Sequence, residues 1–352
     1  MTDTKVEDRI FARFDGRAGL SLAGLCGDLL ADQKRTWPSL AAGHDALAAV
    51  RLRDITCPGF PVRVQFNPQR IVSSTARVDP ESIRKRKCFL CSGNLPLSQK
   101  GIMYRREYLI LCNPAPIFPR HYTIASLNHV PQSIDDHLDV MLLLAKDFSG
   151  DATVLYNGPR SGASAPDHFH FQAAPSGAIP IEGILDEKGR KKRIRRVDGA
   201  SLSRGMNLGR PALIVEGSDA RGVVDLTLAV IDEMRKVLQE PGEPMMNILC
   251  SHWESGWRVT LFPRGRHRPD MFDRSGDEQV LISPGAVDMG GLIITSRERD
   301  FRILDSKMVQ AVFRDVSLDE AKTTALVRAL QGKKSRTLER FGNRVGKVEA
   351  RP

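Results

Sequence analysis

Long apolar runs, a leader segment and cysteine are all scarce or missing in this sequence. No window approaches the roughly 18 consecutive apolar residues of a membrane span, and the first residues lack a basic region followed by an apolar one. Six cysteines among 352 residues are too few for a disulfide scaffold, and only Cys88 and Cys91 are closely spaced. We therefore expect a cytoplasmic protein without a membrane partner, with reduced thiols and one cysteine pair able to bind a metal.

The charge is concentrated in two segments of an otherwise ordinary globular composition. The length suggests about two domains, and 41% hydrophobic with 27% charged residues excludes disorder, collagen and coiled coil for the whole chain. Of the net charge of +10, residues 188–196 carry seven positive charges and residues 333–352 carry a net +5, which leaves a net −2 elsewhere. Nucleic acid is therefore not expected as a partner, although a basic nucleic-acid-binding module stays an alternative.

The apolar periodicity predicts helices and short strands in alternation. An amphipathic helix is expected at 20–35, and strands adjoin in hairpins with helices between them, which favours an α+β fold with antiparallel sheet. Further strands are expected at 62–66, 108–111, 122–127, 153–156, 168–173, 213–216, 246–253, 257–262 and 293–295, and further helices at 135–146, 223–238, 305–313 and 318–330.

The densest chemical signal ends in the segment His168-Phe-His170-Phe-Gln172. Alternate side chains of a strand share a face, so these two histidines and the glutamine would point one way. Upstream, Gly158 and Gly162 make a loop whose backbone N–H groups can approach a polyphosphate. A neutral imidazole beside such a loop can attack an α-phosphorus and form a phosphoramidate. The alternative is two buried, hydrogen-bonded histidines in an ordinary strand.

This segment resembles the active-site strand of the histidine triad (HIT-like) superfamily, in the transferase branch with His-x-His-x-Gln. That branch includes galactose-1-phosphate uridylyltransferase, diadenosine tetraphosphate phosphorylase and GDP-L-galactose phosphorylase. The resemblance implies that His168, His170 and Gln172 are the catalytic residues, with His170 as the nucleophile and Gln172 bonded to the phosphate of the intermediate.

The resemblance extends to the loop before these histidines. It implies that Ser164 and Gly162 contact the same phosphates, and Asn157 matches an asparagine that precedes the loop in the uridylyltransferases. One departure is Asp167, which is inserted between the proline and the first histidine of the uridylyltransferase pattern.

Cys88 and Cys91 form the second signal. Their two-residue gap lets both thiolates reach one metal ion, but a tetrahedral zinc site needs two more ligands. The resemblance to zinc-bearing histidine triad proteins implies that His129 and His168 complete the zinc site. His121 is the rival third ligand, and two reduced thiols in a turn are the alternative without metal.

A basic cluster at 264–268 is the third signal. Arg264, His267 and Arg268 would concentrate positive charge at the end of a strand, suited to a substrate's phosphates or an attacking orthophosphate. The plain alternative is a solvated basic turn. Similar Phe-Pro-Arg-x-x-His segments occur in phosphorylases of the same branch, which favours the functional interpretation.

Two further candidates and the whole-chain pattern complete the resemblance. Asn67 and Arg70, in an Asn-Pro-x-Arg stretch, can line the nucleotide pocket. Across roughly 20–320 the chain resembles an uncharacterised bacterial family, with shared motifs at 113–119 and 283–288.

The resemblance implies two HIT-like halves with N- and C-terminal helices. No His-x-His occurs after residue 170, so we expect one active site, between the halves. The predicted segments are an N-terminal helical segment (1–59), a catalytic half (60–180), a basic loop (181–210), a diverged second half (211–300), C-terminal helices (301–332) and a basic flexible tail (333–352).

The function implied is that of a nucleotidyltransferase or phosphorylase with a covalent nucleotidyl-histidine intermediate. Its substrate would be a nucleoside diphosphate sugar or a dinucleoside polyphosphate, and orthophosphate or a sugar phosphate would accept the nucleotidyl group. A nucleotide hydrolase of the same superfamily is the alternative, although that branch usually has a histidine where Gln172 stands.

Overall fold

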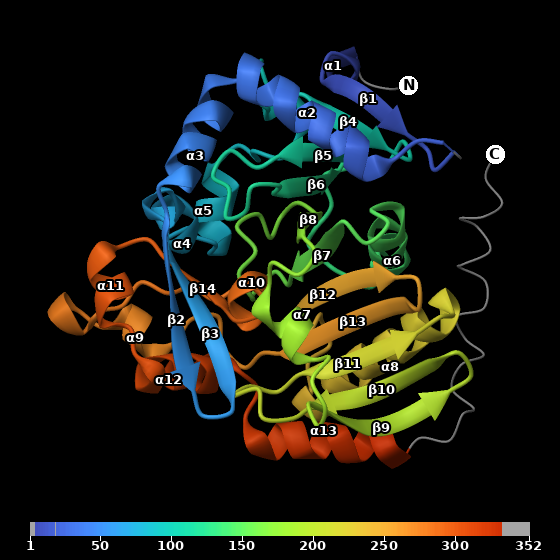
Figure 1. The fold of residues 1–352 in the computed structure, drawn as a ribbon, viewed down its shortest axis with the longest axis vertical. Coiled ribbons are helices and arrows are strands. Elements are labelled where there is room, and N and C mark those ends of the chain that lie inside the picture. Colours follow the sequence, from blue (N-terminus) through green and yellow to red (C-terminus); the bar gives the residue numbers. More distant parts are fainter. Residues whose placement is uncertain (1–3, 18, 333–352) are drawn as a thin grey trace.

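The computed structural model describes residues 4–17 and 19–332, and within them eleven strands form one long sheet (Figure 1). From one edge to the other the strands are β1 (Ile10–Phe14), β4 (Gly101–Tyr104), β5 (Tyr108–Cys112), β6 (Tyr122–Ser126), β8 (His170–Pro175), β7 (Ala152–Asn157), β12 (Met246–Trp253), β13 (Gly256–Pro263), β11 (Leu213–Gly217), β10 (Ala200–Gly205) and β9 (Lys191–Val197). Neighbours are antiparallel except β1 and β4. The expected α+β fold with antiparallel sheet is confirmed.

A small second sheet joins distant parts of the chain. It consists of β2 (Arg51–Cys57), β3 (Phe60–Phe66) and β14 (Leu292–Thr295), in the order β14-β3-β2, with β14 parallel to β3. The strand β3 begins the predicted catalytic half (60–180), and it pairs both with its neighbour β2 and with β14 from the far end of the sequence. Spacing along the chain carries no information about such a parallel, non-local pairing.

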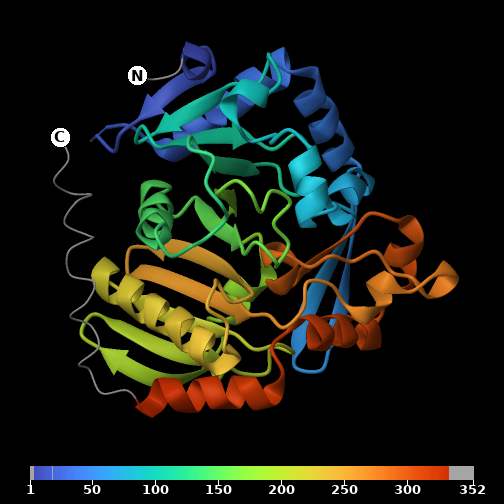
Figure 2. The same cartoon turned by 180° about the vertical axis from the view of Figure 1, so that it is seen from behind.

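The helices form around these two sheets (Figures 1 and 2). The longer ones are α2 (Leu22–Thr36), α3 (Pro38–Ala48), α6 (Leu138–Asp147), α8 (Ala220–Leu238), α12 (Ser306–Val316) and α13 (Glu320–Gly332). The shorter ones are α1 (Thr4–Glu7), α4 (Ile71–Ser74), α5 (Pro80–Lys85), α7 (Pro180–Ile184), α9 (Asp270–Asp273), α10 (Ala286–Met289) and α11 (Glu298–Ile303). None of these described helices is both long and apolar enough to cross a membrane.

Period-2 alternation along the central strands places buried residues in two large cores, one on each face of the long sheet. Val154 and Tyr156 of β7 pack on one side with α2, α6 and α8, whereas Leu155 packs on the other side with the small sheet, α7, α10 and α12. Phe171 and Ala173 of β8 belong to the first core. The opposite face of β8, with His170 and Gln172, is therefore turned toward the side of the small sheet.

The basic segment is not a loop. Residues 191–197 form β9, an edge strand that pairs with β10, and Ile194 and Val197 pack against the first core. Lys191 donates to Glu216 on β11. Charged side chains on an edge strand discourage pairing with another chain. Because five of the seven residues of β9 are charged, the segment lacks the apolar alternation that predicts a strand. The predicted tail, 333–352, lies outside the described residues.

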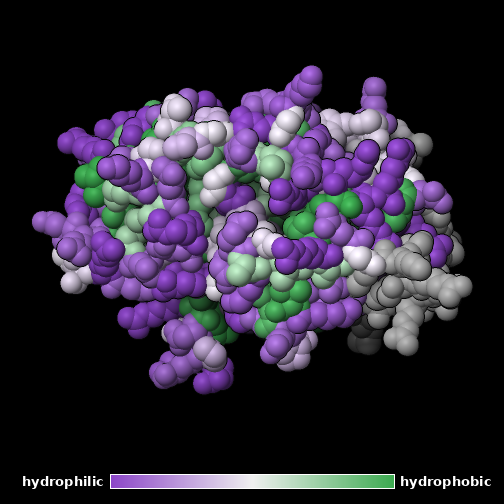
Figure 3. Space-filling model, turned by 90° about the horizontal axis from the view of Figure 1, so that it is seen from below, coloured by the Kyte–Doolittle hydropathy of each residue, from purple (hydrophilic) through white to green (hydrophobic). Residues whose placement is uncertain are grey.

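The surface at the end where α12 and α13 lie is mostly hydrophilic, and its apolar patches are small and separate (Figure 3). The strand β9 lies six strands from β8, about 29 Å at the usual spacing between strands. The positive charge of β9 is therefore remote from the histidine strand.

Candidate active site and metal centre

A cavity open to solvent lies between residues of the long sheet and residues of the small sheet. Gln172 and Asn157 come from the strands β8 and β7, and Ile294 comes from the small sheet. Seven of the predicted site residues line it: Arg70, Asn157, Gly162, Ser164, Gln172, His267 and Arg268. Four others, His168, His170, Asn67 and Arg264, are buried outside the lining.

His170 lies on the cavity-facing side of β8, two residues before Gln172, which places the two Cα atoms about 7 Å apart. Its Nδ1 lies 2.9 Å from the carbonyl oxygen of His168. A carbonyl only accepts, so Nδ1 carries the proton and Nε2 keeps its lone pair. Burial lowers the pKa of His170 to about 4.

Gln132 holds the backbone of His170. Its side-chain oxygen accepts from the His170 N–H at 2.8 Å, and its NH₂ group donates to the carbonyls of His170 and Asn157 at 2.9 and 3.0 Å. One amide thereby replaces strand pairing where β7 and β8 separate. No sequence signal singled out Gln132.

His168 does not share the face of His170. The strand β8 begins only at His170, so period-2 alternation does not extend back to His168, whose fully buried ring points into the cysteine–histidine cluster. Its catalytic role stays a prediction; in this structure its backbone carbonyl, not its imidazole, contacts the candidate nucleophile.

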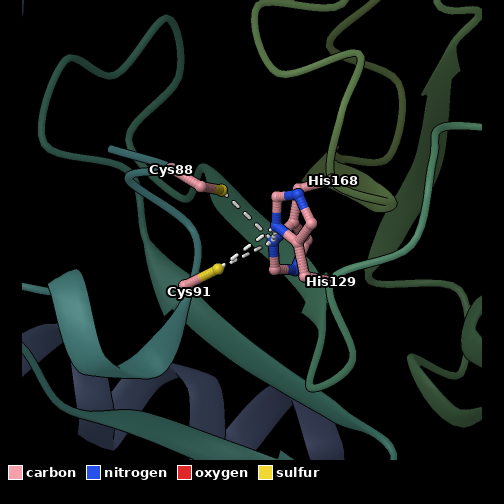
Figure 4. Close-up of side chains that lie close together, drawn as sticks. All are labelled: Cys88, Cys91, His129 and His168. Atoms are coloured by element: carbon pink, nitrogen blue, oxygen red, sulfur yellow. Dashed lines mark hydrogen bonds between the residues drawn. The ribbon is translucent and has the colours of Figure 1, made fainter. Parts of the chain in front are cut away.

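Cys88, Cys91, His129 and His168 come together as one cluster whose ligand atoms all lie within 4.8 Å of one another (Figure 4). Cys88 Sγ lies 3.3 Å from His168 Nδ1, Cys91 Sγ lies 3.3 Å from His129 Nδ1, and the two Nδ1 atoms are 3.2 Å apart. Ligands at 2.0–2.3 Å from a tetrahedral ion are about 3.3–3.8 Å apart. The cluster can therefore hold a metal ion.

Contacts of His168 and Asp167 with neighbouring residues orient the imidazoles of the cluster. His168 Nε2 donates to the carbonyl of Ser126 at 2.7 Å, which leaves the Nδ1 lone pair directed at the thiols. The inserted Asp167 pairs with Arg86 at 2.7 Å and lies 3.8 Å from His129 Nε2. His121, the rival ligand, is not part of the cluster: it contacts Gln172 instead.

A buried hydrogen-bond network fixes the loop of Gly162 and Ser164. Asn247 on β12 donates to the Asn157 side chain at 2.8 Å and to the carbonyl of Ser161 at 2.6 Å. Gly162 has φ +93°, and a Cβ there would lie only 2.9 Å from the Cα of Gly285. The loop therefore requires glycine both for its conformation and for its contact with the second part of the chain.

Arg264 does not supply charge to the cavity. It is 1% exposed, and all five of its N–H donors are bonded to protein oxygens. The acceptors are Val316 O, Asn247 Oδ1, Pro284 O, Arg266 O and His267 O. Burial lowers the pKa of Arg264 to about 9. The alternation of side chains along a strand could not predict the burial of Arg264, because its hydrogen-bond acceptors come from four separate segments of the chain.

Arg268 and His267 do face the cavity. Arg268 donates to Ser283 Oγ at 3.1 Å and to the carbonyl of Ala76 at 3.0 Å, which fixes its guanidinium at the wall. Burial and the neighbouring arginines lower the pKa of His267 to about 4. Arg266 is exposed and pairs with Asp270.

Asn67 and Arg70 hydrogen-bond to the backbone of the loop at residues 115–117. Asn67 donates to the carbonyl of Pro116 at 3.0 Å, and Arg70 donates to that of Ala115 at 3.0 Å. Gln65 donates to the carbonyl of Ile117 at 3.1 Å. Only Arg70 also lines the cavity.

The site contains residues that the sequence analysis did not assign. Ser73 and Ser74 line the cavity, as do Ser283 and Gly285 within the motif noted at 283–288. Asp288 lines it too, and burial raises its pKa to about 6. The motif at 283–288 could have indicated that its residues line the site, whereas no sequence pattern indicated Ser73 and Ser74.

Comparisons with known proteins agree with this architecture. Residues 29–175 match a domain of unknown function (DUF4922), and residues 206–333 match the GDPGP1-like, C-terminal domain. No curated protein is significantly similar in sequence. The crystal structure of yeast Ap4A phosphorylase Apa2 is similar with a TM-score of 0.57 and 15% identity, over 86% of this chain and 95% of that chain. The crystal structure of the same enzyme in complex with Ap4A is similar with a TM-score of 0.55 and 16% identity, over 84% of this chain and 97% of that chain.

These similarities show the HIT-like fold that the resemblance implied.

Proposed function

We propose that this chain is a phosphorylase-type nucleotidyltransferase that acts on a dinucleoside polyphosphate or a nucleoside diphosphate sugar. The observation that carries the proposal is the tautomer of His170, whose Nδ1 donates to the carbonyl of His168 and whose Nε2 keeps a free lone pair. No described residue bonds that Nε2. The yeast phosphorylase with this fold, which binds Ap4A, supports the same class of substrate.

The reaction proceeds by two displacements at one phosphorus atom. His170 Nε2 attacks the α-phosphorus, a P–N bond forms, and the P–O bond to the leaving nucleotide or sugar phosphate breaks. An oxygen of orthophosphate or of a sugar phosphate then attacks the same phosphorus, which breaks the P–N bond and releases the nucleotidyl group on the acceptor. Arg70 and Arg268 offset the charge on the phosphoryl oxygens from the cavity wall.

We further propose that the metal is zinc. Two thiols and two imidazoles at tetrahedral spacing form a closed site, which suits a structural rather than a catalytic ion. Bound there, the ion would stabilise the turn that carries His168 and hence the carbonyl that orients His170.

The test is to incubate the protein with labelled Ap4A and a panel of labelled nucleotide sugars and to quench without acid, because phosphoramidates are acid-labile. A labelled adduct is expected on the wild type and on His252→Ala, a control outside the site, and none on His170→Ala. Release of a nucleoside diphosphate only when phosphate is supplied identifies a phosphorylase, and release of a monophosphate without phosphate identifies a hydrolase. No adduct with any substrate, together with equal turnover by His170→Ala, contradicts the mechanism.

A further inference from the structure

Gln172 can face the cavity with either end of its side-chain amide, and the two ends have opposite properties. The oxygen accepts hydrogen bonds and the NH₂ group donates them. Phosphate oxygens only accept, so the orientation of this amide decides whether it attracts or repels a phosphate. The side-chain oxygen of Gln172 lies 2.8 Å from Nε2 of His121.

The direction of that hydrogen bond follows from the other side of the imidazole. His121 Nδ1 lies 3.1 Å from the backbone nitrogen of Ile117, which can only donate, so Nδ1 has no proton. Burial and the charge of Arg70 lower the pKa of His121 to about 3, so its ring is neutral near pH 7. The single ring proton is therefore on Nε2, and Gln172 accepts it.

Three side-chain hydrogen bonds fix the segment that carries Ile117. Its carbonyls at 115, 116 and 117 accept from Arg70, Asn67 and Gln65, which lie on β3 or in the turn that follows it. The backbone N–H of residue 117 is thereby fixed toward His121. The small sheet thus sets the imidazole that contacts Gln172.

We propose that His121 is a positioning residue that locks the Gln172 amide with its NH₂ group toward the cavity, where it donates to the transferred phosphate. The identity of the anion rests on the proposed function, but the orientation does not. No described residue bonds the Gln172 NH₂ group, and Gln172 lines the cavity.

The orientation is tested directly by the tautomer of His121. Long-range ¹H–¹⁵N NMR of ¹⁵N-labelled protein, with the signal assigned through His121→Gln, should show a neutral ring protonated at Nε2 from pH 6 to 8. A ring protonated at Nδ1, or a charged ring at pH 7, overturns the assignment. This measurement needs no substrate, so it decides the orientation even if no transfer activity is found and the proposed function fails.

The catalytic consequence is tested by a double-mutant cycle on kcat and KM. Loss of a phosphate donor in Gln172→Ala should lower kcat about 100-fold, and His121→Phe about 10-fold with a smaller change in KM. The double variant should match Gln172→Ala within about twofold, because His121 acts only through Gln172. An additive loss of about 1000-fold contradicts the proposal.

Two further variants separate positioning from folding. His121→Gln keeps a side-chain donor and should retain kcat within about threefold of the wild type. His252→Phe makes the same change as His121→Phe at a partly exposed site on β12 and should leave kcat unchanged. Equal losses in His121→Gln and His121→Phe would show that the imidazole acts through packing alone and would also overturn the proposal.

Discussion

The backbone carbonyl of His168 accepts a hydrogen bond from Nδ1 of His170, while the imidazole of His168 lies in the cysteine–histidine cluster, 3.3 Å from Cys88 Sγ. One residue thus joins the candidate metal centre to the candidate nucleophile. Whatever holds the ring of His168 also places the carbonyl that selects the reactive tautomer of His170. A metal ion bound in this cluster would act on His170 through this geometry.

The first prediction concerns this coupling. Protein purified without chelator should contain about one zinc per chain by elemental analysis. Cys88→Ser should lose the metal and lower the free energy of unfolding by roughly 3–5 kcal/mol, with a smaller effect on the rate of nucleotidylation per folded molecule. Cys112→Ala is the control, since it removes a buried thiol outside the cluster and should keep the metal. Well under one zinc per wild-type chain contradicts the metal assignment.

The second prediction concerns Arg264. Arg264→Met leaves five oxygens without their donors in the interior and should lower the free energy of unfolding by at least about 3 kcal/mol. Denaturant titration measures this loss. Arg266→Met, two residues away on the surface, should change stability little. If the two variants were equally stable, Arg264 would not be the brace that the contacts describe.

The third prediction separates two roles of Gly162. Gly162 and Gly177 both have positive φ, but only at Gly162 would an added Cβ meet another part of the chain. Gly177→Ala should cost about 1 kcal/mol of stability through its backbone alone. Gly162→Ala should cost more, about 2–3 kcal/mol, and should weaken binding of inorganic pyrophosphate in calorimetry. Equal costs would show that the contact with Gly285 is not tight.

The fourth prediction concerns pH. Burial raises the pKa of Glu243 to about 7 from 4.5, and its carboxylate accepts from Tyr156 and Ile134. Between these pH values the folded state binds more protons than the unfolded state, so the free energy of unfolding falls as pH rises, by an amount of the order of 3 kcal/mol. Glu243→Gln cannot ionise, so its stability relative to the wild type should rise from pH 4.5 to 7.

Denaturant titrations at several pH values check this slope. Glu240→Gln is the control, because it makes the same change at a neighbouring, partly exposed glutamate that pairs with Arg160. The pH dependence assigned to Glu243 is the difference between the slopes of the two variants. A flat difference for Glu243→Gln would contradict the prediction.

The sequence alone determined the local features of this protein. Period-2 and period-3.6 patterns predicted most strands and all of the longer helices except α3, since they record which face of each element is buried. Leu138, Met141, Leu142 and Ala145, which recur at helical spacing in the helix predicted at 135–146, are all buried in α6. The resemblance brought the four metal-cluster residues together correctly, because that arrangement depends on short motifs held at fixed places in one fold.

Only the tertiary structure decided which groups meet across the chain. Arg264 proved to be a buried brace, His121 the partner of Gln172, and β3 the neighbour of β14. Such contacts depend on the path of the backbone between distant segments, and a side chain's type does not state which segment lies opposite it. A histidine or an arginine in the sequence has several chemical roles open to it, and its neighbours in space select one.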